Sequence, residues 1–273
     1  QQQQEERQRR RRQQRRRVAI VDPDTQHAIT HTLLPQLKRD DGSFQCTRTS
    51  SSEHDMRFLY CACAISYMLD DWTGVDRDGA VRYIETCRSY DGAMGLSPGQ
   101  EGHGGSTFCG VASLLLMNRL DDVLSRNNWK DELIQWCVQR QQDGGGLQGR
   151  PNKNEDTCYS YWIGGTLRLL GHYDLLLDQG KLNEFVLSCQ SKQMGGFSKV
   201  QGSFPDLLHS FYSLAWLSLA NDSKDDTTSS DGNSKEGRTN KSIPKTIFPL
   251  NELNCTLGIR KKRAERLGGH PVP

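Results

Sequence analysis

The chain has 273 residues with a formal net charge of +2, and 34% of its residues are hydrophobic. No apolar run is long enough to cross a bilayer and no signal-peptide core is present, so we expect a cytoplasmic protein. The nine cysteines are irregularly spaced and form no CxxC pair, which argues against a zinc ribbon or a thioredoxin-like motif and favours reduced, buried thiols.

The first segment, residues 1–17, holds eight Arg, seven Gln and two Glu and no apolar residue. Such a low-complexity sequence cannot bury enough apolar surface to fold, so it predicts a disordered tail. Without this tail the formal charge of the chain is −4 instead of +2. A polybasic tail can contact nucleic acid or an anionic membrane. No folded basic face with interleaved aromatic residues supports nucleic-acid binding, which we therefore do not expect.

A repeat of about 50 residues follows. Asp41-Gly42, Asp91-Gly92 and Asp143-Gly144 stand 50 and 52 residues apart, and Gly195-Gly196 comes 52 residues after Asp143. Glycine supplies the positive φ that a tight turn needs. Each turn leads through a loop into an apolar helical pattern, and a second helix precedes the next turn. The helices expected after the turns span residues 56–69, 106–120, 158–170 and 207–219, and those before the turns span 81–87, 131–141 and 182–190.

These helical hairpins predict an all-α class, with a stacked or closed array in which the more apolar helices form an inner ring. We assign this α/α barrel to residues 18–220. Only four turns are visible, so we expect the barrel to be incomplete at its N-terminus. Residues 221–246 are rich in Asp, Ser, Thr and Lys and predict a disordered linker. Residues 247–273 form a segment of unassigned role, with a short docking helix expected over 247–267.

Three polar stretches occupy equivalent positions of the repeat, at residues 102–106, 149–165 and 203–209, and each enters a helix. Because the repeat puts these loops at the same end of the array, we expect them to converge on one mouth. Asp156, Cys158 and His209 would then meet as three ligands of zinc-binding type, which leaves the fourth position open, as in catalytic zinc sites. Taken singly, His209 is more simply a satisfied core or capping histidine, and Cys158 a small buried hydrophobe.

The same mouth would gather hydrogen-bond donors and aromatic rings. The donors are His103, Arg150, Lys153, Tyr159 and Lys199. They include three fixed positive charges without an acidic cluster, which suits a diphosphate leaving group. The aromatic residues able to line an apolar pocket are Tyr60, Phe108, Trp162, Phe211, Tyr212 and Trp216. Considered alone, the aromatic residues would be core and Lys199 would be a solvated surface residue.

Several segments, in order and at matching intervals, resemble the beta subunits of protein prenyltransferases. They are DMRFLYCA (55–62), HGGSTFCG (103–110), GRPNK…DTCYSYW (149–162) and GGF…PDLLHS (195–210), and the resemblance covers about residues 38–220. It is strongest to protein geranylgeranyltransferase type I. It implies an α/α barrel (toroid) paired with a helical-repeat alpha subunit. The implied reaction moves geranylgeranyl from geranylgeranyl diphosphate to the Cys of a C-terminal CaaX motif, forming a thioether on proteins such as Rho-type small GTPases.

Carried over by motif, the resemblance implies one zinc ion on Asp156, Cys158 and His209. It implies diphosphate contacts from His103, Arg150, Lys153 and Tyr159, and isoprenoid or peptide contacts from Arg57, Tyr60, Cys109 and Trp162. Two positions discriminate within the family. Lys199 stands where farnesyltransferase has a magnesium-binding Asp, and Leu208 stands where it has an aromatic residue. Both favour the geranylgeranyl enzyme, and Lys199 implies catalysis that needs no magnesium.

The chain also departs from the family pattern. The hairpins before the first turn, which include residues that gauge isoprenoid length, are replaced by the Gln/Arg tail. Two alternatives therefore stay open: a truncated, non-catalytic subunit that binds the alpha partner or a prenyl lipid, and a farnesyltransferase-type enzyme. The complete ligand triad and the cations favour an enzyme, because a decayed copy need not keep all of them.

Overall fold

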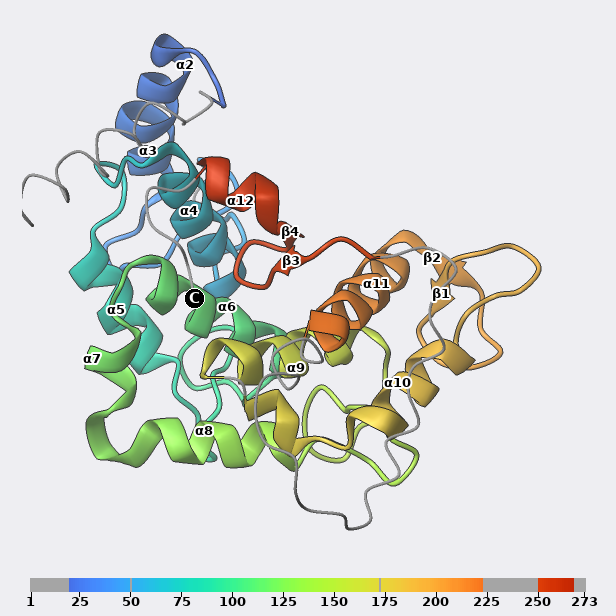
Figure 1. Cartoon of the computed structure of the whole chain (residues 1–273). Coiled ribbons are helices and arrows are strands. Elements are labelled where there is room, and N and C mark those ends of the chain that lie inside the picture. The colour runs from blue at the N-terminus through green and yellow to red at the C-terminus, as the bar shows by residue number, and fades with distance from the viewer. Residues whose placement is uncertain (1–19, 50, 172, 223–249, 268–273) are drawn as a thin grey trace, which may run out of the picture.

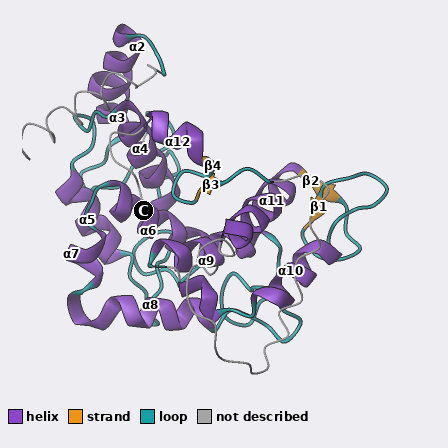
Figure 2. Ribbon diagram, viewed as in Figure 1, coloured by secondary structure: helices purple, strands orange, loops and turns teal. Residues whose placement is uncertain are grey.

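A computed structural model describes residues 20–49, 51–171, 173–222 and 250–267 (Figure 1). Helices dominate this part of the chain, as Figure 2 shows, and the predicted all-α class is confirmed. The predicted Gln/Arg tail (1–17) and most of the predicted linker (223–246) lie outside the described residues.

Two sets of helices alternate along the chain. The inner set comprises α4 (Met56–Leu69), α6 (Gly104–Leu116), α9 (Cys158–Leu169) and α11 (Leu207–Asp222). Each inner helix packs against the next one, α4 on α6, α6 on α9 and α9 on α11. The outer set comprises α5 (Arg77–Thr86), α8 (Trp129–Val138) and α10 (Gln179–Ser188). This alternation is the helical-hairpin architecture that the repeat predicts.

Shorter elements connect and flank the hairpins. Before the first turn run α2 (Pro23–His27), η1 (Ala28–Leu33) and α3 (Leu34–Leu37), a helical stretch that we did not predict. The connecting elements are α7 (Leu120–Leu124), η2 (Arg126–Asn128) and η3 (Tyr173–Leu176). Strand β1 (Phe197–Ser198) pairs antiparallel with β2 (Pro205–Asp206), and β3 (Leu253–Asn254) pairs with β4 (Ile259–Arg260), which precedes α12 (Lys261–Leu267).

Polar side chains start three of the inner helices. Asp55 accepts a hydrogen bond from the backbone N–H of Arg57 at 2.8 Å, which caps α4. His103 Nδ1 accepts one from Gly105 N at 3.1 Å and caps α6. Asp206 accepts one from the backbone N–H at the start of α11. Since the first N–H groups of a helix have no partner within the helix, these residues satisfy them. The same polar residues stand near the loops that carry the candidate site.

The turn glycines seat each hairpin against the next outer helix. Gly42 has a φ of +89°, and a Cβ built on it would overlap the carbonyl of Gly79 in α5. Gly145 has a φ of +92°, and a Cβ there would lie 2.5 Å from the carbonyl oxygen of Lys181 in α10. Any other residue would be strained in this backbone conformation and would also clash. The sequence repeat therefore sets the spacing of the outer helices.

The hydrophobic core lies between the two helix sets. Its largest fully buried side chain, Trp216 of α11, donates a hydrogen bond through Nε1 to Asn183 Oδ1 of α10 at 2.9 Å. Met56, Phe108 and Ile163 bring inner helices α4, α6 and α9 into the same core cluster. Fully burying side chains of this kind contributes roughly 1.5–3 kcal/mol each. The inner helices are thus the more buried set, as predicted.

The C-terminal segment differs from the prediction. A helix was expected over 247–267, but of the described residues 250–267 the β3–β4 hairpin occupies 253–260, and only α12 is helical. The reason is local: Gly258 has a φ of +65°, and the Asn254 side chain accepts a hydrogen bond from Leu257 N at 2.9 Å. Both features favour a turn over a helix. The predicted linker also begins too early, because Asn221 and Asp222 continue α11.

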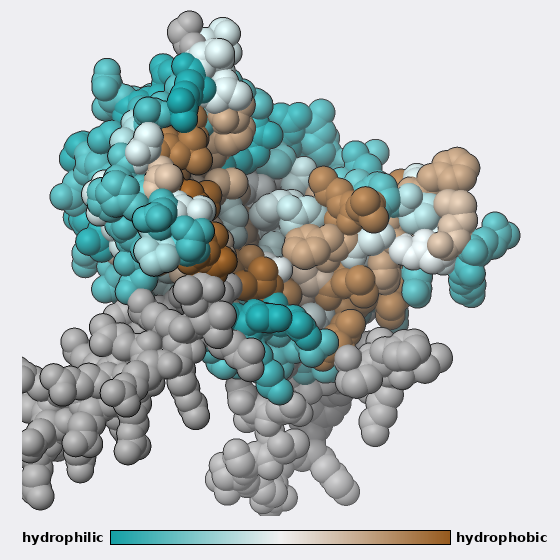
Figure 3. Space-filling model, turned by 90° about the horizontal axis from the view of Figure 1, so that it is seen from above, coloured by the Kyte–Doolittle hydropathy of each residue, from teal (hydrophilic) through white to brown (hydrophobic). Residues whose placement is uncertain are grey.

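Within the described part of the chain, the helices are all too short or too polar to span a membrane. In the space-filling view of Figure 3, hydrophobic residues gather around the middle of one face. Several large apolar side chains at and before α11 are exposed, including Phe204 at 83% and Leu207 at 91%.

Candidate functional site

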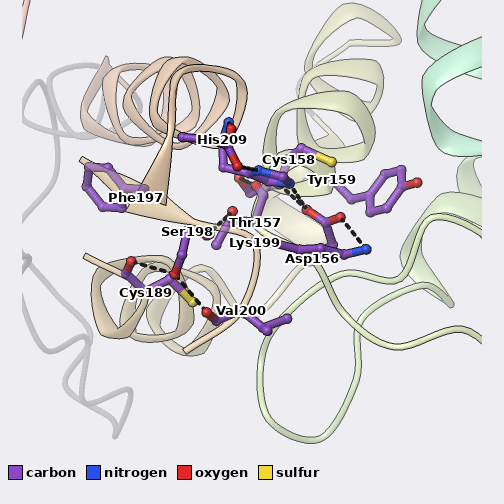
Figure 4. Close-up of polar contacts among 12 residues, drawn as sticks. Asp156, Thr157, Cys158, Tyr159, Cys189, Phe197, Ser198, Lys199, Val200 and His209 are labelled. Carbon is purple, nitrogen blue, oxygen red and sulfur yellow. Dashed lines mark hydrogen bonds and ion pairs between the residues drawn. The ribbon is translucent and has the colours of Figure 1, made fainter. Parts of the chain in front are cut away.

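Asp156, Cys158 and His209 come together as predicted. One ligand atom of each lies within 4.8 Å of the others. Cys158 is the first residue of α9 and His209 the third of α11, and these two helices pack against each other. Figure 4 shows the three side chains gathered beside the starts of the two helices. The repeat thus brings together residues that are distant in the sequence.

Two carboxylates orient the His209 ring. Its Nε2 lies 3.2 Å from Asp156 Oδ1, and its Nδ1 lies 2.6 Å from Asp206 Oδ2. With Nδ1 donating to Asp206, Nε2 faces the other two ligands with its lone pair available to a metal. The backbone N–H of His209, and then its ring, lower the pKa of Asp206 by hydrogen bonding. The sequence analysis missed Asp206, although an Asp three residues before the His, at a helix start, is typical of a capping residue.

The donor set fits zinc. Burial, with the neighbouring Asp156 carboxylate, raises the pKa of the Cys158 thiol. A doubly charged cation beside the sulfur has the opposite effect and favours the thiolate. A carboxylate oxygen, a thiolate sulfur and an imidazole nitrogen are all zinc ligands, and three protein ligands leave one position open.

Lys199 lies at the edge of this cluster. Its Nζ is 3.7 Å from Asp156 Oδ2, and its side chain is 61% exposed. The Lys199 carbonyl accepts a hydrogen bond from Thr157 N at 3.0 Å, and the Ser198 carbonyl accepts one from Thr157 Oγ1 at 2.8 Å (Figure 4). The loop after β1 is therefore tied to the loop before α9. This arrangement holds an ammonium group close to the three ligands.

A pocket of about 430 Å³ opens beside the ligands, with Asp156 in its wall. The remaining predicted donors line the same pocket: His103, Arg150, Lys153, Tyr159 and Lys199. Loops from three repeats thus meet at one mouth, and the pocket combines positive charge with an uncharged histidine–tyrosine pair.

His103 and Tyr159 form a hydrogen-bonded pair across two repeats. Because His103 Nδ1 accepts from Gly105 N, its Nε2 carries the proton and donates to Tyr159 Oη at 2.9 Å. Burial lowers the pKa of His103, so the neutral ring is favoured. Gly149 allows this arrangement, since a Cβ there would overlap the ring of Tyr159.

Acidic residues also border the pocket, where the sequence analysis expected no acidic cluster among the donors. Glu101 forms an ion pair with Arg150, and Glu155 is part of the pocket wall. Glu101 stands two residues before His103, but only the meeting of two loops brings it to Arg150. The positive charge of the pocket is therefore partly balanced by carboxylates.

The residues predicted to contact the isoprenoid or the peptide differ in their burial and in their partners. Tyr60, Cys109 and Trp162 come from α4, α6 and α9, and the ring of Trp162 packs at a tilt of 46° against Tyr212 of α11 with ring centroids 4.4 Å apart. Cys109 is only 3% exposed. Tyr60 donates its hydroxyl hydrogen to a backbone carbonyl of the C-terminal segment.

Arg57 and Leu208 lie nearer the surface. Arg57 donates to Glu53 and Asp55, each at 2.6 Å, so its charge is matched by two carboxylates. Leu208 is 53% exposed at the start of α11, next to His209.

Comparisons with known proteins place this geometry in a family. The prenyltransferase alpha-alpha toroid domain family matches residues 21–256. The geranylgeranyl transferase type-1 subunit beta of Arabidopsis thaliana is 50% identical over 189 residues, covering 67% of this chain and 50% of that protein. The subunit of the same name from Dictyostelium discoideum is 41% identical over 194 residues, covering 71% and 53%. The chain therefore spans about half the length of these relatives.

A farnesyltransferase subunit and a solved structure extend the comparison. The protein farnesyltransferase subunit beta of Schizosaccharomyces pombe is 31% identical over 236 residues, covering 80% of this chain and 58% of that protein. The Candida albicans protein geranylgeranyltransferase-I complexed with GGPP superposes with a TM-score of 0.67 at 26% identity, covering 86% of this chain and 65% of the other. This chain belongs to the prenyltransferase alpha-alpha toroid domain family, and its relatives include geranylgeranyl transferase type-1 beta subunits.

Proposed function

We propose that this chain is the catalytic beta subunit of a zinc-dependent protein geranylgeranyltransferase type I. It would transfer geranylgeranyl from geranylgeranyl diphosphate to the Cys of a C-terminal CaaX motif. The observation that carries the proposal is the cluster of Asp156, Cys158 and His209 beside a pocket lined by cations. The names of two relatives, and a solved structure described as bound to GGPP, support the geranylgeranyl class.

Asp156, Cys158 and His209 would hold zinc, which would supply a Lewis acid able to stabilise a thiolate. The acceptor Cys loses its thiol proton to solvent, its sulfur bonds to C1 of the isoprenoid, and the bond from C1 to the diphosphate oxygen breaks, releasing diphosphate. Negative charge therefore builds up on the leaving diphosphate. Arg150 and Lys153 offer charge-assisted hydrogen bonds to it.

The pocket's remaining donors act on the same leaving group. A diphosphate oxygen beside Tyr159 would accept the phenol hydrogen, because His103 Nε2–H occupies a lone pair of that hydroxyl. By analogy with oxyanion holes, the loss of one such donor costs about 2.7–4 kcal/mol of transition-state stabilisation. Lys199 supplies a compact positive charge and makes magnesium unnecessary.

The proposal includes a helical-repeat alpha subunit as partner, CaaX proteins such as Rho-type small GTPases as substrates, and a cytoplasmic location. The exposed apolar side chains Phe204 and Leu207 support a protein contact, since large apolar groups exposed together mark interaction sites. The charge balance of the chain supports no nucleic-acid partner.

One experiment tests the proposal against its rivals. The chain is co-expressed with a helical-repeat alpha subunit, and transfer from geranylgeranyl and farnesyl diphosphates to a CaaX peptide ending in Leu is measured. We expect one zinc per chain and faster transfer of geranylgeranyl. Binding of the lipid diphosphate without transfer would favour the non-catalytic subunit instead. Faster transfer of farnesyl would favour the farnesyltransferase-type enzyme.

A further inference from the structure

The C-terminal segment, residues 250–267, carries a charge opposite to that of the body of the chain. It holds five Lys or Arg and two Glu, a formal charge of +3. Residues 18–249 hold 22 Lys or Arg and 29 Asp or Glu, a formal charge of −7. Four of the basic residues of the segment are consecutive, at positions 260–263. A compact basic segment on an acidic body favours an anionic ligand at that place.

This segment is anchored to the inner helices by the turn between its two strands. Tyr60 of α4 donates its hydroxyl hydrogen to the Thr256 carbonyl at 2.6 Å, and Tyr161 of α9 donates to the Cys255 carbonyl at 2.7 Å. Ala264 is buried, and α12 packs against α4. The backbone that carries the basic side chains is therefore fixed, which lowers the entropic cost of binding a ligand there.

The β3–β4 hairpin and α12 together form a second pocket, of about 330 Å³. Its lining residues come from the approach to β3, the end of β4 and the first turn of α12: Asn251, Glu252, Arg260, Lys262 and Arg263. The backbone N–H of Lys261 donates to the Glu252 carbonyl at 2.8 Å, which holds the start of α12 beside the start of β3. Residues from both ends of the hairpin thus face one cavity.

The charge of this second pocket is mostly positive. Within the described part of the chain, Arg260, Lys262 and Arg263 form no ion pair. The acidic lining residue, Glu252, lies with Oε2 3.6 Å from Lys261 Nζ, so its charge is matched by a fourth cation. Guanidinium and ammonium groups both form charge-assisted hydrogen bonds with phosphate oxygens. Three cations thus stay available to a ligand.

The second pocket is separate from the pocket beside the metal ligands. Among the described residues, the two pockets share no lining residue. Figure 1 shows α12 beside α4, on a different side of the molecule from β1 and β2, which precede the helix that carries His209. A ligand in the second pocket would therefore leave the metal ligands and the first pocket open.

We propose that the second pocket binds a ligand with several clustered phosphate groups, of the kind found on the headgroup of a phosphorylated inositol lipid. Several cations around one concave site meet several negative charges at once, which a single carboxylate does not offer. Clusters of four or more Lys and Arg on a helix with an apolar face are typical of binding to anionic lipids. A free inositol phosphate carries the same chemistry, so the test includes both sources.

Two double substitutions distinguish the two pockets. Lys262→Gln with Arg263→Gln removes two cations from the second pocket, and both side chains are exposed, so the fold should be kept. Arg150→Gln with Lys153→Gln removes two cations from the pocket beside the metal ligands. The change in net charge is the same in both variants, so only the place of the lost charges differs.

Two single substitutions distinguish a defined site from diffuse attraction. Glu252→Gln removes the carboxylate that lines the second pocket and releases Lys261. Glu265→Gln removes an exposed carboxylate of the same helix, outside the lining of that pocket. Both raise the net charge of the segment by one.

The full chain is titrated with inositol trisphosphate by calorimetry. It is also sedimented with phosphatidylcholine vesicles that contain or lack phosphatidylinositol bisphosphate. Each Lys or Arg near an anionic surface contributes about a factor of five, so the Lys262–Arg263 variant should bind inositol trisphosphate about 30-fold more weakly. The Arg150–Lys153 variant should bind it like the unaltered chain. Glu252→Gln should bind up to about fivefold more tightly, and Glu265→Gln should bind unchanged.

The vesicles identify the source of the phosphates. Loss of binding by the Lys262–Arg263 variant to both the trisphosphate and the phosphoinositide vesicles supports the site and assigns it to a membrane lipid. Loss toward the trisphosphate in a chain that never binds the vesicles supports the site and assigns it to a free ligand.

Other outcomes overturn the inference. If affinity falls in the Arg150–Lys153 variant and not in the Lys262–Arg263 variant, the trisphosphate occupies the pocket beside the metal ligands. Equal gains in Glu252→Gln and Glu265→Gln, or binding to vesicles without binding to the trisphosphate, would show diffuse attraction instead of a site. A chain that binds neither probe also refutes it, and the proposed transferase function stands or falls separately.

Discussion

The imidazole of His209 lies between two carboxylates, with Nδ1 2.6 Å from Asp206 Oδ2 and Nε2 3.2 Å from Asp156 Oδ1. Asp156 belongs to the candidate metal site, and Asp206 accepts a hydrogen bond from the ring nitrogen that faces away from that site. Asp206 also caps the helix that carries His209, since it accepts the backbone N–H of that residue at 2.9 Å. A single side chain thus sets both the position and the tautomer of the ligand.

Removing the anionic acceptor behind His209 should weaken zinc binding. In Asp206→Asn the cap of α11 is kept, but the ring loses a charged partner, so zinc affinity should fall about 10–100-fold. Competition with a chromogenic chelator measures it. Asp76→Asn is the matched control, because Asp76 caps α5 in the same way, accepting from Gly79 N at 3.0 Å, far from the ligands. Equal zinc affinity in both variants would contradict the role of Asp206.

Replacing the thiol ligand should abolish stoichiometric zinc. Cys158→Ala removes the only sulfur donor among the three clustered ligands, and two remaining side chains do not complete a zinc site. Elemental analysis of the purified protein gives the metal content. Cys137→Ala, which removes a buried thiol from α8, should retain one zinc per chain. Full zinc in the Cys158 variant would refute the triad.

The pocket's buried histidine should make stability depend on pH. Burial lowers the pKa of His103 below its ordinary value of 6.5. Below pH 6.5 the unfolded chain therefore binds a proton that the folded chain does not, and the free energy of unfolding should fall with pH down to the lowered pKa. Urea unfolding at several pH values between 7.5 and 5 measures this dependence. It should be weaker in His103→Asn, which keeps a capping side chain. An identical pH dependence in the two proteins would show that His103 does not contribute.

Releasing Arg150 from its carboxylate should strengthen anion binding. In Glu101→Gln the ion pair is lost and the pocket gains net positive charge. An exposed pair is worth at most about 1 kcal/mol, so inorganic diphosphate should bind up to about fivefold more tightly. Glu85→Gln is the control, since it breaks the Glu85–Arg126 pair on the outer face. Calorimetry that finds both variants alike would show that Glu101 does not compete with the anion.

Lys199 should decide the magnesium requirement of the complete heterodimer. With its ammonium beside the leaving group, transfer should need zinc but not magnesium. Lys199→Asp replaces this charge with a carboxylate, so transfer should slow sharply and recover in part with added magnesium. Lys199→Ala should be slow with or without it. Transfer rates across a magnesium titration test the assignment, which fails if the unaltered enzyme depends on magnesium or if Lys199→Asp does not respond.

Much of the fold follows from short stretches of sequence. The turn glycines Gly42 and Gly92 adopt the positive φ that their spacing predicts, whereas in the third turn the positive φ falls on Gly145, one residue after the predicted Gly144. The inner helix α4 begins and ends at the predicted residues, Met56–Leu69. The predicted helix over 106–120 was wrong at both ends, because His103 caps α6 earlier and Asn118, with a φ of +57°, separates α6 from α7. Helix ends depend on single capping contacts, which periodicity does not register.

The sequence by itself determined the repeat, the class and the three metal-ligand candidates, because each depends on residue type and spacing along the chain. The repeat was enough to predict that Asp156 and His209 meet, since equivalent loops lie at the same end of stacked hairpins. Only the tertiary structure decided that Glu101 pairs with Arg150 and that Tyr60 holds Thr256, 196 residues away. The repeat brings the loops of Glu101 and Arg150 together without specifying which side chains pair, and no local pattern encodes which distant backbone carbonyl a partly buried phenol will reach.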